Sequence, residues 1–121
     1  PHAVSYPFTS YFKISHGHAV SLTLEKFLMF NYNNINYSKA NFNLKDRYKT
    51  LFKITKTNSI IELIFFLKKL KREAKLEDDF KKMNIDIEKK LSKILKGVNE
   101  LRLKNNPINL TKNDISNILL V

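Results

Sequence analysis

Two histidines near the start of the chain, His2 and His16, are the residues whose type and spacing could do chemistry. Imidazole nitrogens that bind one ion each lie roughly 2.0–2.1 Å from it. One unbroken helix would separate these two residues by about 21 Å, because a helix rises 1.5 Å per residue. Two histidines at this spacing also occur by chance; if they share one ion, the chain must reverse at residues 13–15, with Ser15 as the N-cap of the next helix.

The residues around His16 decide how good a metal site could be. In the first turn of a helix the dipole disfavours an imidazolium, and a neutral ring is what a metal requires. Gly17 would allow a close backbone approach, and His18 is either a second-shell group or simply exposed. Glu25 would lie more than two turns along the same helix and out of reach. Two imidazoles without a carboxylate make an incomplete site.

The composition predicts a single all-α domain that must position these residues. The chain has 121 residues, with only two Gly and three Pro, which favours long regular elements over turn-rich β architecture. It has no Cys, which excludes disulfides, thiolate metal sites and cysteine catalysis. No signal peptide is recognisable, so we expect a cytoplasmic protein.

Apolar spacing predicts the helices and their ends. The first half shows helices over 2–12, with a kink at Pro7, over 16–30 as one element and over 44–55. Residues 31–43 form a loop, with or without a short helix. A helix from Ser59 to about Glu73 is apolar nearly all round, which predicts burial on several sides, and Ser59 with Glu62 resembles a capping box. Asp86 would begin a helix that ends at a left-handed Gly97.

The last part of the chain contains a break and a final helix. Asn105-Asn106-Pro107 interrupts the helical pattern. Thr111 and Asp114 form a second predicted capping box, which begins a closing helix.

The net charge of +11, from 22 basic and 11 acidic residues, suggests an alternative function as a basic helical binding module for nucleic acid or an anionic surface. Only three of the cations are Arg, the better reader of bases and phosphates, and the Lys residues are scattered. We therefore expect no specific nucleic-acid partner. The most apolar window, 60–67, is too short to cross a membrane.

The stretch from Pro1 to Asn31 resembles the segment of the iron-containing (group III) alcohol dehydrogenases that carries two metal-binding histidines. His2 and the pair His16-Gly17 match that motif, and Pro7 falls on the family's Pro. The stretch 101–107, followed by 110–115, is similar to the family's closing motif and last helix. The resemblance implies the helical C-terminal domain of the dehydroquinate synthase-like fold.

The resemblance also implies a chemistry. Members transfer hydride between NAD(P)H and a small alcohol or aldehyde, with Fe²⁺ or Zn²⁺ held by one Asp and three His. His2 and His16 would be two of these ligands, while the Asp, the third His and most of the nucleotide site would lie in an upstream domain. Residues 1–121 would then be a single metal-binding domain, truncated at its N-terminal edge, and part of a possible homo-oligomer in the full-length protein.

This sequence departs from the family pattern at several positions. Many members have a second His four residues after the first ligand, where this chain has Tyr6, a poorer base that is still a candidate catalytic residue. Lys13 and Ser15 replace the residues usual before His-Gly. The run around His2 and His16 is similar to the branch that acts on phosphonate aldehydes.

Three expectations follow from a missing upstream domain. The chain alone should be inactive and should bind iron or zinc weakly. Apolar surface should be exposed near residues 2–12, where the other domain would dock. A decayed gene product, in which only the helical domain survives, is a further alternative, and an Asp-x-x-x-His motif encoded before Pro1 would distinguish these cases.

Overall fold

The structure, a computed structural model that describes residues 1–121, consists of helices joined by turns. In chain order these are α1 (His2–Phe12), α2 (His16–Ser21), α3 (Leu24–Asn33), the short 3₁₀ helix η1 (Ile35–Tyr37), α4 (Leu44–Thr55), α5 (Ile60–Glu73), α6 (Ile87–Lys96), α7 (Glu100–Leu103) and α8 (Lys112–Leu120). The predicted all-α fold is confirmed. The patterning missed the single-turn helix α7, which is too short to show a periodic apolar stripe, and it joined α2 and α3 into one helix.

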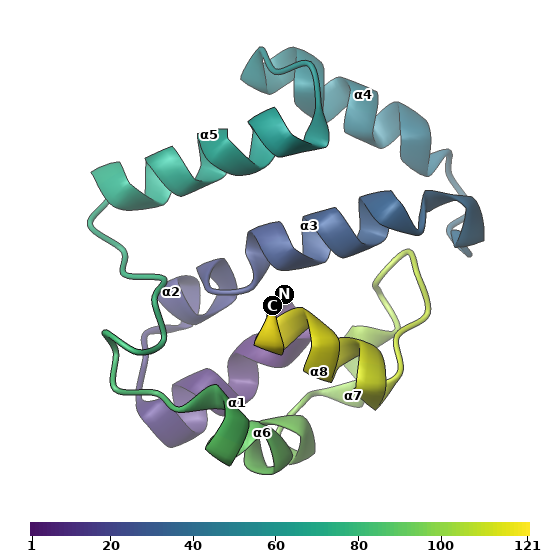
Figure 1. Ribbon diagram of the computed structural model, residues 1–121. Coiled ribbons are helices and arrows are strands. Elements are labelled where there is room, and N and C mark those ends of the chain that lie inside the picture. The colour runs from purple at the N-terminus through teal and green to yellow at the C-terminus, as the bar shows by residue number, and fades with distance from the viewer.

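Helix α3 lies between two groups of helices (Figure 1). On one side α4 and α5 pack over it, and on the other side lie α1, α6 and α8. Each group has its own apolar core, and α3 contributes to both, because Phe27 faces the first core while Leu28 and Met29 face the second. The site described below belongs to the first group.

The first core is built on α1. Val4 and Phe8 of this helix are completely buried, together with Ile94 of α6 and Ile115 of α8. The Phe8 ring stacks on Phe80, with ring centroids 5.5 Å apart and planes 10° from parallel. Burial of each such side chain stabilises the fold by about 1.5–3 kcal/mol relative to its exposure. These contacts fix the position of α1, and with it the position of His2.

The end of α6 packs closely on α1. A Cβ at Gly97 would lie only 2.8 Å from Cβ of Pro7, so no larger residue fits there. Gly97 has φ −85°, and the predicted left-handed conformation is therefore wrong: this glycine serves close packing. Pro7 has no N–H to give to the Ala3 carbonyl, and Asn99 N–H donates to that oxygen instead, at 3.0 Å.

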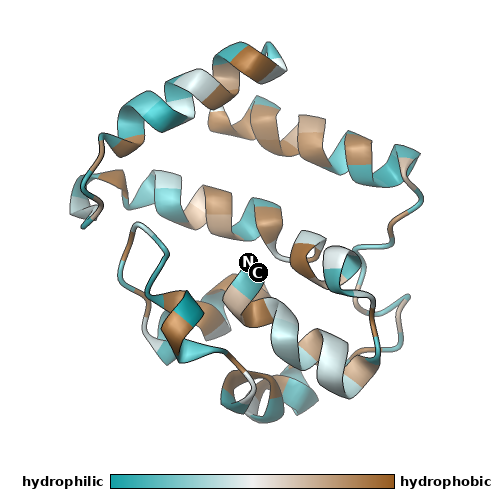
Figure 2. Cartoon of the chain, turned by 180° about the vertical axis from the view of Figure 1, so that it is seen from behind, coloured by the Kyte–Doolittle hydropathy of each residue, from teal (hydrophilic) through white to brown (hydrophobic).

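The second core lies between α3, α4 and α5. Leu44, Tyr48, Ile60 and Leu63 form its buried part. Apolar residues run along both α3 and α5 (Figure 2). The prediction that α5 is buried on several sides is wrong, since Phe65 is 68% exposed and Ile61 is also exposed. No helix combines the length and the apolar character needed to cross a membrane.

Most helix starts follow the predicted capping chemistry. The Thr111–Asp114 capping box is complete, with both reciprocal bonds present. Ser59 accepts a hydrogen bond from the backbone N–H of Glu62 at 3.2 Å, but the Glu62 carboxylate accepts from Asn58 N–H rather than from Ser59. Only one of the two predicted capping-box bonds is therefore present, and the second is made to Asn58, one residue earlier than predicted.

The predicted helix over 16–30 is broken at residues 22–23. Leu22 N–H and the Ser21 hydroxyl both donate to the His18 carbonyl, which closes α2. Thr23 then leaves helical geometry, with φ −120° and ψ 1°, before α3 begins. Ser and Thr favour such ends because their hydroxyls compete for backbone groups and β-branched Thr fits a helix less well. The break changes the direction in which Glu25 points.

Exposed apolar surface near residues 2–12 is limited to Tyr11 and to Leu101 on the neighbouring α7, so the expectation of a docking patch on α1 itself is wrong. Apart from Tyr11, the large apolar side chains of α1 are covered by the rest of the chain. Exposed apolar side chains lie instead on α4 and α5, at Leu51, Ile54, Ile61, Phe65 and Leu70. The error arose because the spacing of residues 2–12 does not show that α2, α6 and α7 pack around α1.

Candidate metal centre

Helices α1 and α2 form a corner that brings His2 and His16 together. Lys13 ends α1 in the left-handed conformation, with φ 54° and ψ 33°, and the chain turns back at residues 13–15. The centroids of the two imidazole rings lie 4.8 Å apart, with planes 60° from parallel. The predicted reversal is confirmed. Ser15 stands at the N-cap of α2, but its side chain makes no capping hydrogen bond, so that part of the prediction is wrong.

The distance between the rings fits two ligands of one ion. Imidazole nitrogens at about 2.0–2.1 Å from a tetrahedral ion place their ring centroids roughly 5 Å apart. Both side chains are exposed, so an ion can reach them. No group of three or more His, Cys, Asp or Glu side chains in this chain could hold a metal. The chain thus offers two donors that fit a metal, and a complete donor set needs others.

The surroundings of His2 favour its neutral ring. Desolvation lowers the pKa of His2 below its ordinary value of 6.5, and the nearby charges of Arg102 and His16 lower it further. A neutral imidazole has the free lone pair that a metal ligand needs. No carboxylate opposes this effect, because the ion pairs of the chain all lie elsewhere.

Tyr6 lies beside the two histidines. It follows His2 by one turn of α1, and its ring centroid lies 5.7 Å from that of His2 and 6.3 Å from that of His16. The three predicted site residues are therefore gathered at one place, with the phenol of Tyr6 next to the imidazole pair.

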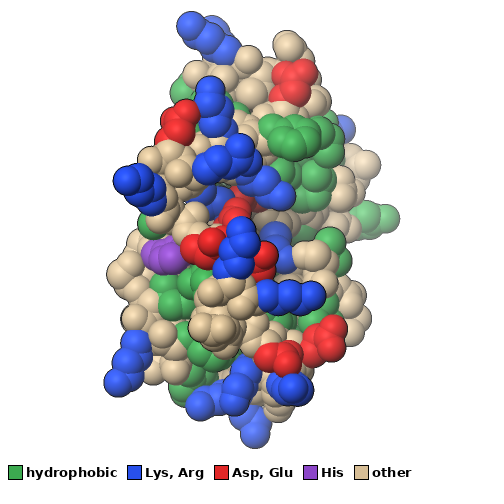
Figure 3. Space-filling view, turned by 60° about the vertical axis from the view of Figure 1, so that its left-hand side comes forward, with side chains coloured by type: hydrophobic (Ala, Val, Ile, Leu, Met, Phe, Trp, Pro, Cys, Tyr) green, Lys and Arg blue, Asp and Glu red, His purple; other side chains and the backbone are tan.

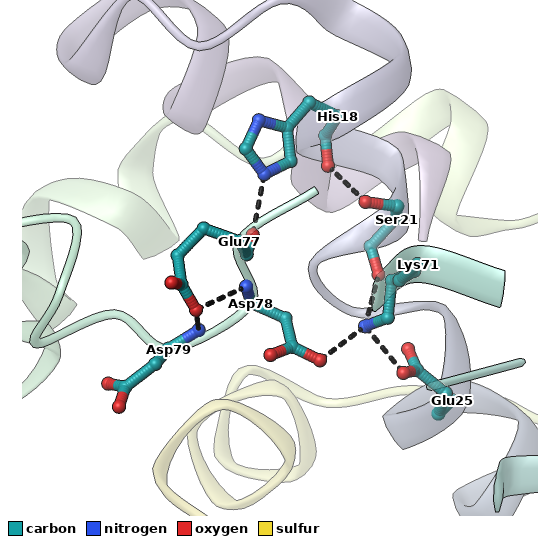
Figure 4. Close-up of polar contacts among 7 residues, drawn as sticks. All are labelled: His18, Ser21, Glu25, Lys71, Glu77, Asp78 and Asp79. Carbon is teal, nitrogen blue, oxygen red and sulfur yellow. Dashed lines mark hydrogen bonds and ion pairs between the residues drawn. The ribbon is translucent and has the colours of Figure 1, made fainter. Parts of the chain in front are cut away.

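His18 and Gly17 do not join this group. The Nε2–H of His18 donates to the carbonyl of Glu77 at 2.6 Å, so its ring is directed toward the 74–79 segment (Figure 4). His18 is half-buried, so the alternative of a simply exposed residue is wrong, and its ring is bonded to Glu77 rather than to either predicted ligand. Nothing in the chain comes within 4 Å of a Cβ placed at Gly17, so no close approach occurs there either.

Glu25 has a structural partner. Its carboxylate lies 2.5 Å from Nζ of Lys71, which also pairs with Asp78 at 3.0 Å (Figure 4). Glu25 and Lys71 are both buried, and their mutual charge compensates for their loss of hydration. The sequence pattern held a signal for this pair, because Lys71 continues the buried stripe of Ile60 and Leu63 at helical spacing.

A comparison with known protein families agrees with the paired histidines of this site. A family model described as "Fe-containing alcohol dehydrogenase family, C-terminal" matches residues 1–120. The chain belongs to this family. No curated protein and no solved structure was found to match it. The histidine pair of this iron-containing alcohol dehydrogenase domain lies at the start of the matched region, and the capping box of α8 lies at its end.

Sequence reasoning missed two residues near the pair. Arg102, on α7, acts on His2 from a helix that was not predicted. Asn31, near the end of α3, is buried and hydrogen-bonded to Asn106. The Asn-rich composition of residues 31–43 concealed this pairing, because one buried Asn in such a run looks like its exposed neighbours.

Proposed function

We propose that residues 1–121 form the C-terminal helical domain of a metal-dependent alcohol dehydrogenase or aldehyde reductase. Family membership supports an oxidoreductase, and the adjacent rings of His2 and His16 carry the proposal. In this proposal the two imidazoles hold Fe²⁺ or Zn²⁺ together with an Asp and a His from an upstream domain, which also binds most of the NAD(P)H. That nucleotide, when bound, would supply hydride-transfer chemistry for a small alcohol or aldehyde.

Each residue of the site has a defined task in this proposal. The ion, when bound, supplies Lewis acidity for the substrate oxygen. His2 and His16 hold the ion through neutral rings, and the lowered pKa of His2 supports that state at neutral pH. Tyr6, whose ring lies beside both imidazoles, would donate a hydrogen bond to the substrate oxygen and so orient the substrate.

A narrower proposal concerns the branch of the family to which this chain belongs. The residues around His2 and His16 are similar to those of enzymes that act on phosphonate aldehydes, as described above. A phosphonate aldehyde is therefore one substrate to include in an activity screen.

The decisive experiment compares three histidine variants of the full-length protein encoded by this gene. His2→Ala and His16→Ala should each lower kcat/KM at least 100-fold and lower the bound metal content, since each removes a ligand. His18→Ala is the matched control, because that ring is directed toward Glu77, and it should retain bound metal and most activity. Equal losses in all three variants would contradict the proposal.

The coding sequence before Pro1 provides a second, cheaper test. An Asp-x-x-x-His motif there is expected, because the pair in this chain needs two more donors. An open reading frame that begins at this domain, with no such motif, would refute the assignment to a complete dehydrogenase.

The face drawn in Figure 3 gives no support to the alternative of a basic binding module. On the face drawn in Figure 3, Lys and Arg side chains are interspersed with acidic and apolar groups and form no continuous stripe. A polyanion-binding surface would gather its cations along one face.

A further inference from the structure

We infer that a pocket beside His2 binds a small oxyanion, a carboxylate or a phosphoryl group, through Arg102 and Asn31. If the proposed function holds, on which this part of the inference rests, the substrate carries an anionic group away from its reacting carbon. As a statement about binding it stands on this chain alone.

The pocket lies where α1, α3 and α7 meet. It has a volume of about 280 Å³, which suits a group of a few heavy atoms rather than a whole cofactor. His2 stands among its lining residues, and no Asp or Glu does. Its wall includes the apolar side chains Ala3, Phe27, Leu103, Pro107 and Leu110.

Arg102 supplies the side-chain charge for this pocket, whose lining also includes Pro1. Its guanidinium forms no ion pair with a carboxylate, although the chain contains 11 acidic residues. A guanidinium presents a planar set of N–H donors that matches a carboxylate or a phosphoryl group. An unpaired Arg in a pocket without acids therefore favours an anion over a neutral or cationic ligand.

Asn31 supplies an oriented donor. Asn106 Nδ2–H donates to the Ile108 carbonyl at 2.9 Å, and because a carbonyl only accepts, this bond fixes the orientation of the Asn106 amide. The two amides then bond reciprocally, with Asn31 Nδ2–H donating to Asn106 at 3.0 Å and Asn106 donating back at 2.8 Å. One amide hydrogen of Asn31 is left over.

The second hydrogen on Asn31 Nδ2 makes no hydrogen bond within the chain. Asn31 is only 7% exposed, and it lines the same pocket as Arg102 and His2. A buried donor without an acceptor is costly, whereas an anionic oxygen in the pocket would satisfy it. Two donors of different kinds, one charged and one buried, thus converge on a space next to the proposed metal ligand.

The test is a titration of the metal-free chain followed by ¹⁵N NMR. Acetate and inorganic phosphate represent the two sources of the oxyanion, and acetamide is the neutral match of acetate. At least one anion should give saturable shifts at the Asn31 side-chain amide and the Arg102 Nε–H, while acetamide should give none. Arg102→Gln should weaken the binding about tenfold, as expected for loss of a charge-assisted bond.

Arg72→Gln is the matched control, since it removes the same charge from an exposed position on α5. It should change the affinity less than twofold. Equal weakening in the two variants would mean that the anion responds to net charge alone, and would overturn the inference. Shifts that never saturate, or that acetamide reproduces, would also overturn it.

A kinetic comparison in the full-length protein tests the statement about substrates. Arg102→Gln should raise KM for a four-carbon aldehyde with a terminal carboxylate about tenfold more than it changes KM for butanal, since any effect of Arg102 on His2 is common to both substrates. If the metal-ligand variants leave activity intact while anion binding depends on Arg102, the proposed function fails and the binding pocket stands. If the anions do not bind, the inference fails and the metal site is unaffected.

Discussion

The buried ion pair between Lys71 and Glu25 should be the most mutation-sensitive polar contact of the chain. The side chain of Lys71 is 10% exposed and that of Glu25 is 6% exposed, whereas Asp78, the second partner, is 38% exposed. Lys71→Met keeps a similar volume and removes the charge. Asp78 then returns to solvent at little cost, but Glu25 stays buried without its partner.

The size of the loss follows from that asymmetry. Removal of one partner of a buried pair destabilises a protein by about 3–5 kcal/mol, because the other charge is left uncompensated. We expect about 3 kcal/mol here, which corresponds to a drop in Tm of about 10 °C for a domain of this size. Thermal and urea unfolding followed by circular dichroism would measure both quantities.

Two further variants make the reasoning testable. Lys69→Met on the same helix is the control, since that side chain is 74% exposed and lies 3.9 Å from Glu73, a geometry worth less than about 0.5 kcal/mol. Glu25→Leu combined with Lys71→Met should recover at least half of the loss, because two apolar groups replace the pair. A Lys71→Met loss equal to that of Lys69→Met would refute the argument.

Three other perturbations test separate parts of the fold. Lys13→Gly should stabilise the chain by about 0.5–1 kcal/mol in urea unfolding, since position 13 has φ 54°, while Ser10→Gly inside the same helix should destabilise it by a similar amount. Tyr48→Phe should cost about 1 kcal/mol, because the Tyr48 hydroxyl donates to the Leu28 carbonyl at 2.8 Å; an unchanged Tm would count against that bond. The third concerns Asp78: burial would raise its pKa, but the paired ammonium group outweighs this and lowers the pKa below 3.8. A depressed folded-state pKa stabilises the protein above pH 3.8, and this stabilisation is lost as the pH falls through the folded-state value. Asp78→Asn should therefore reduce the slope of stability against pH in acid, and an unchanged slope would contradict the assignment.

The sequence predicted those features that depend on local patterns. Helix α4 has the predicted bounds, and the capping box of Thr111 and Asp114 needs only residues within one turn of each other. The reversal at Lys13 also followed from local geometry, once His2 and His16 were required to meet. The spacing of the two histidines, together with the resemblance of residues 1–31 to the family's metal-binding segment, therefore located the candidate metal centre.

Several other errors concern contacts between residues distant in the chain. Lys71 shares the helical spacing of Ile60 and Leu63, but Glu25 is far away in sequence, so the local pattern did not show what Lys71 would pair with. The close contact of Gly97 with Pro7 and the bond between His18 and Glu77 are equally non-local. Tertiary packing decided each of these, and it overrode the propensity that a single segment displays.

The central claim is that the imidazoles of His2 and His16 share one metal ion. The most direct measurement is ¹⁵N NMR of the imidazole nitrogens while Zn²⁺ is added to the isolated chain. We predict that one nitrogen of His2 and one of His16 shift together, with the same weak affinity and a 1:1 stoichiometry, while the His18 ring does not respond. Independent saturation of the two rings, or a response centred on His18, would contradict the shared site, and a tight 1:1 site would contradict the view that further ligands come from outside this chain.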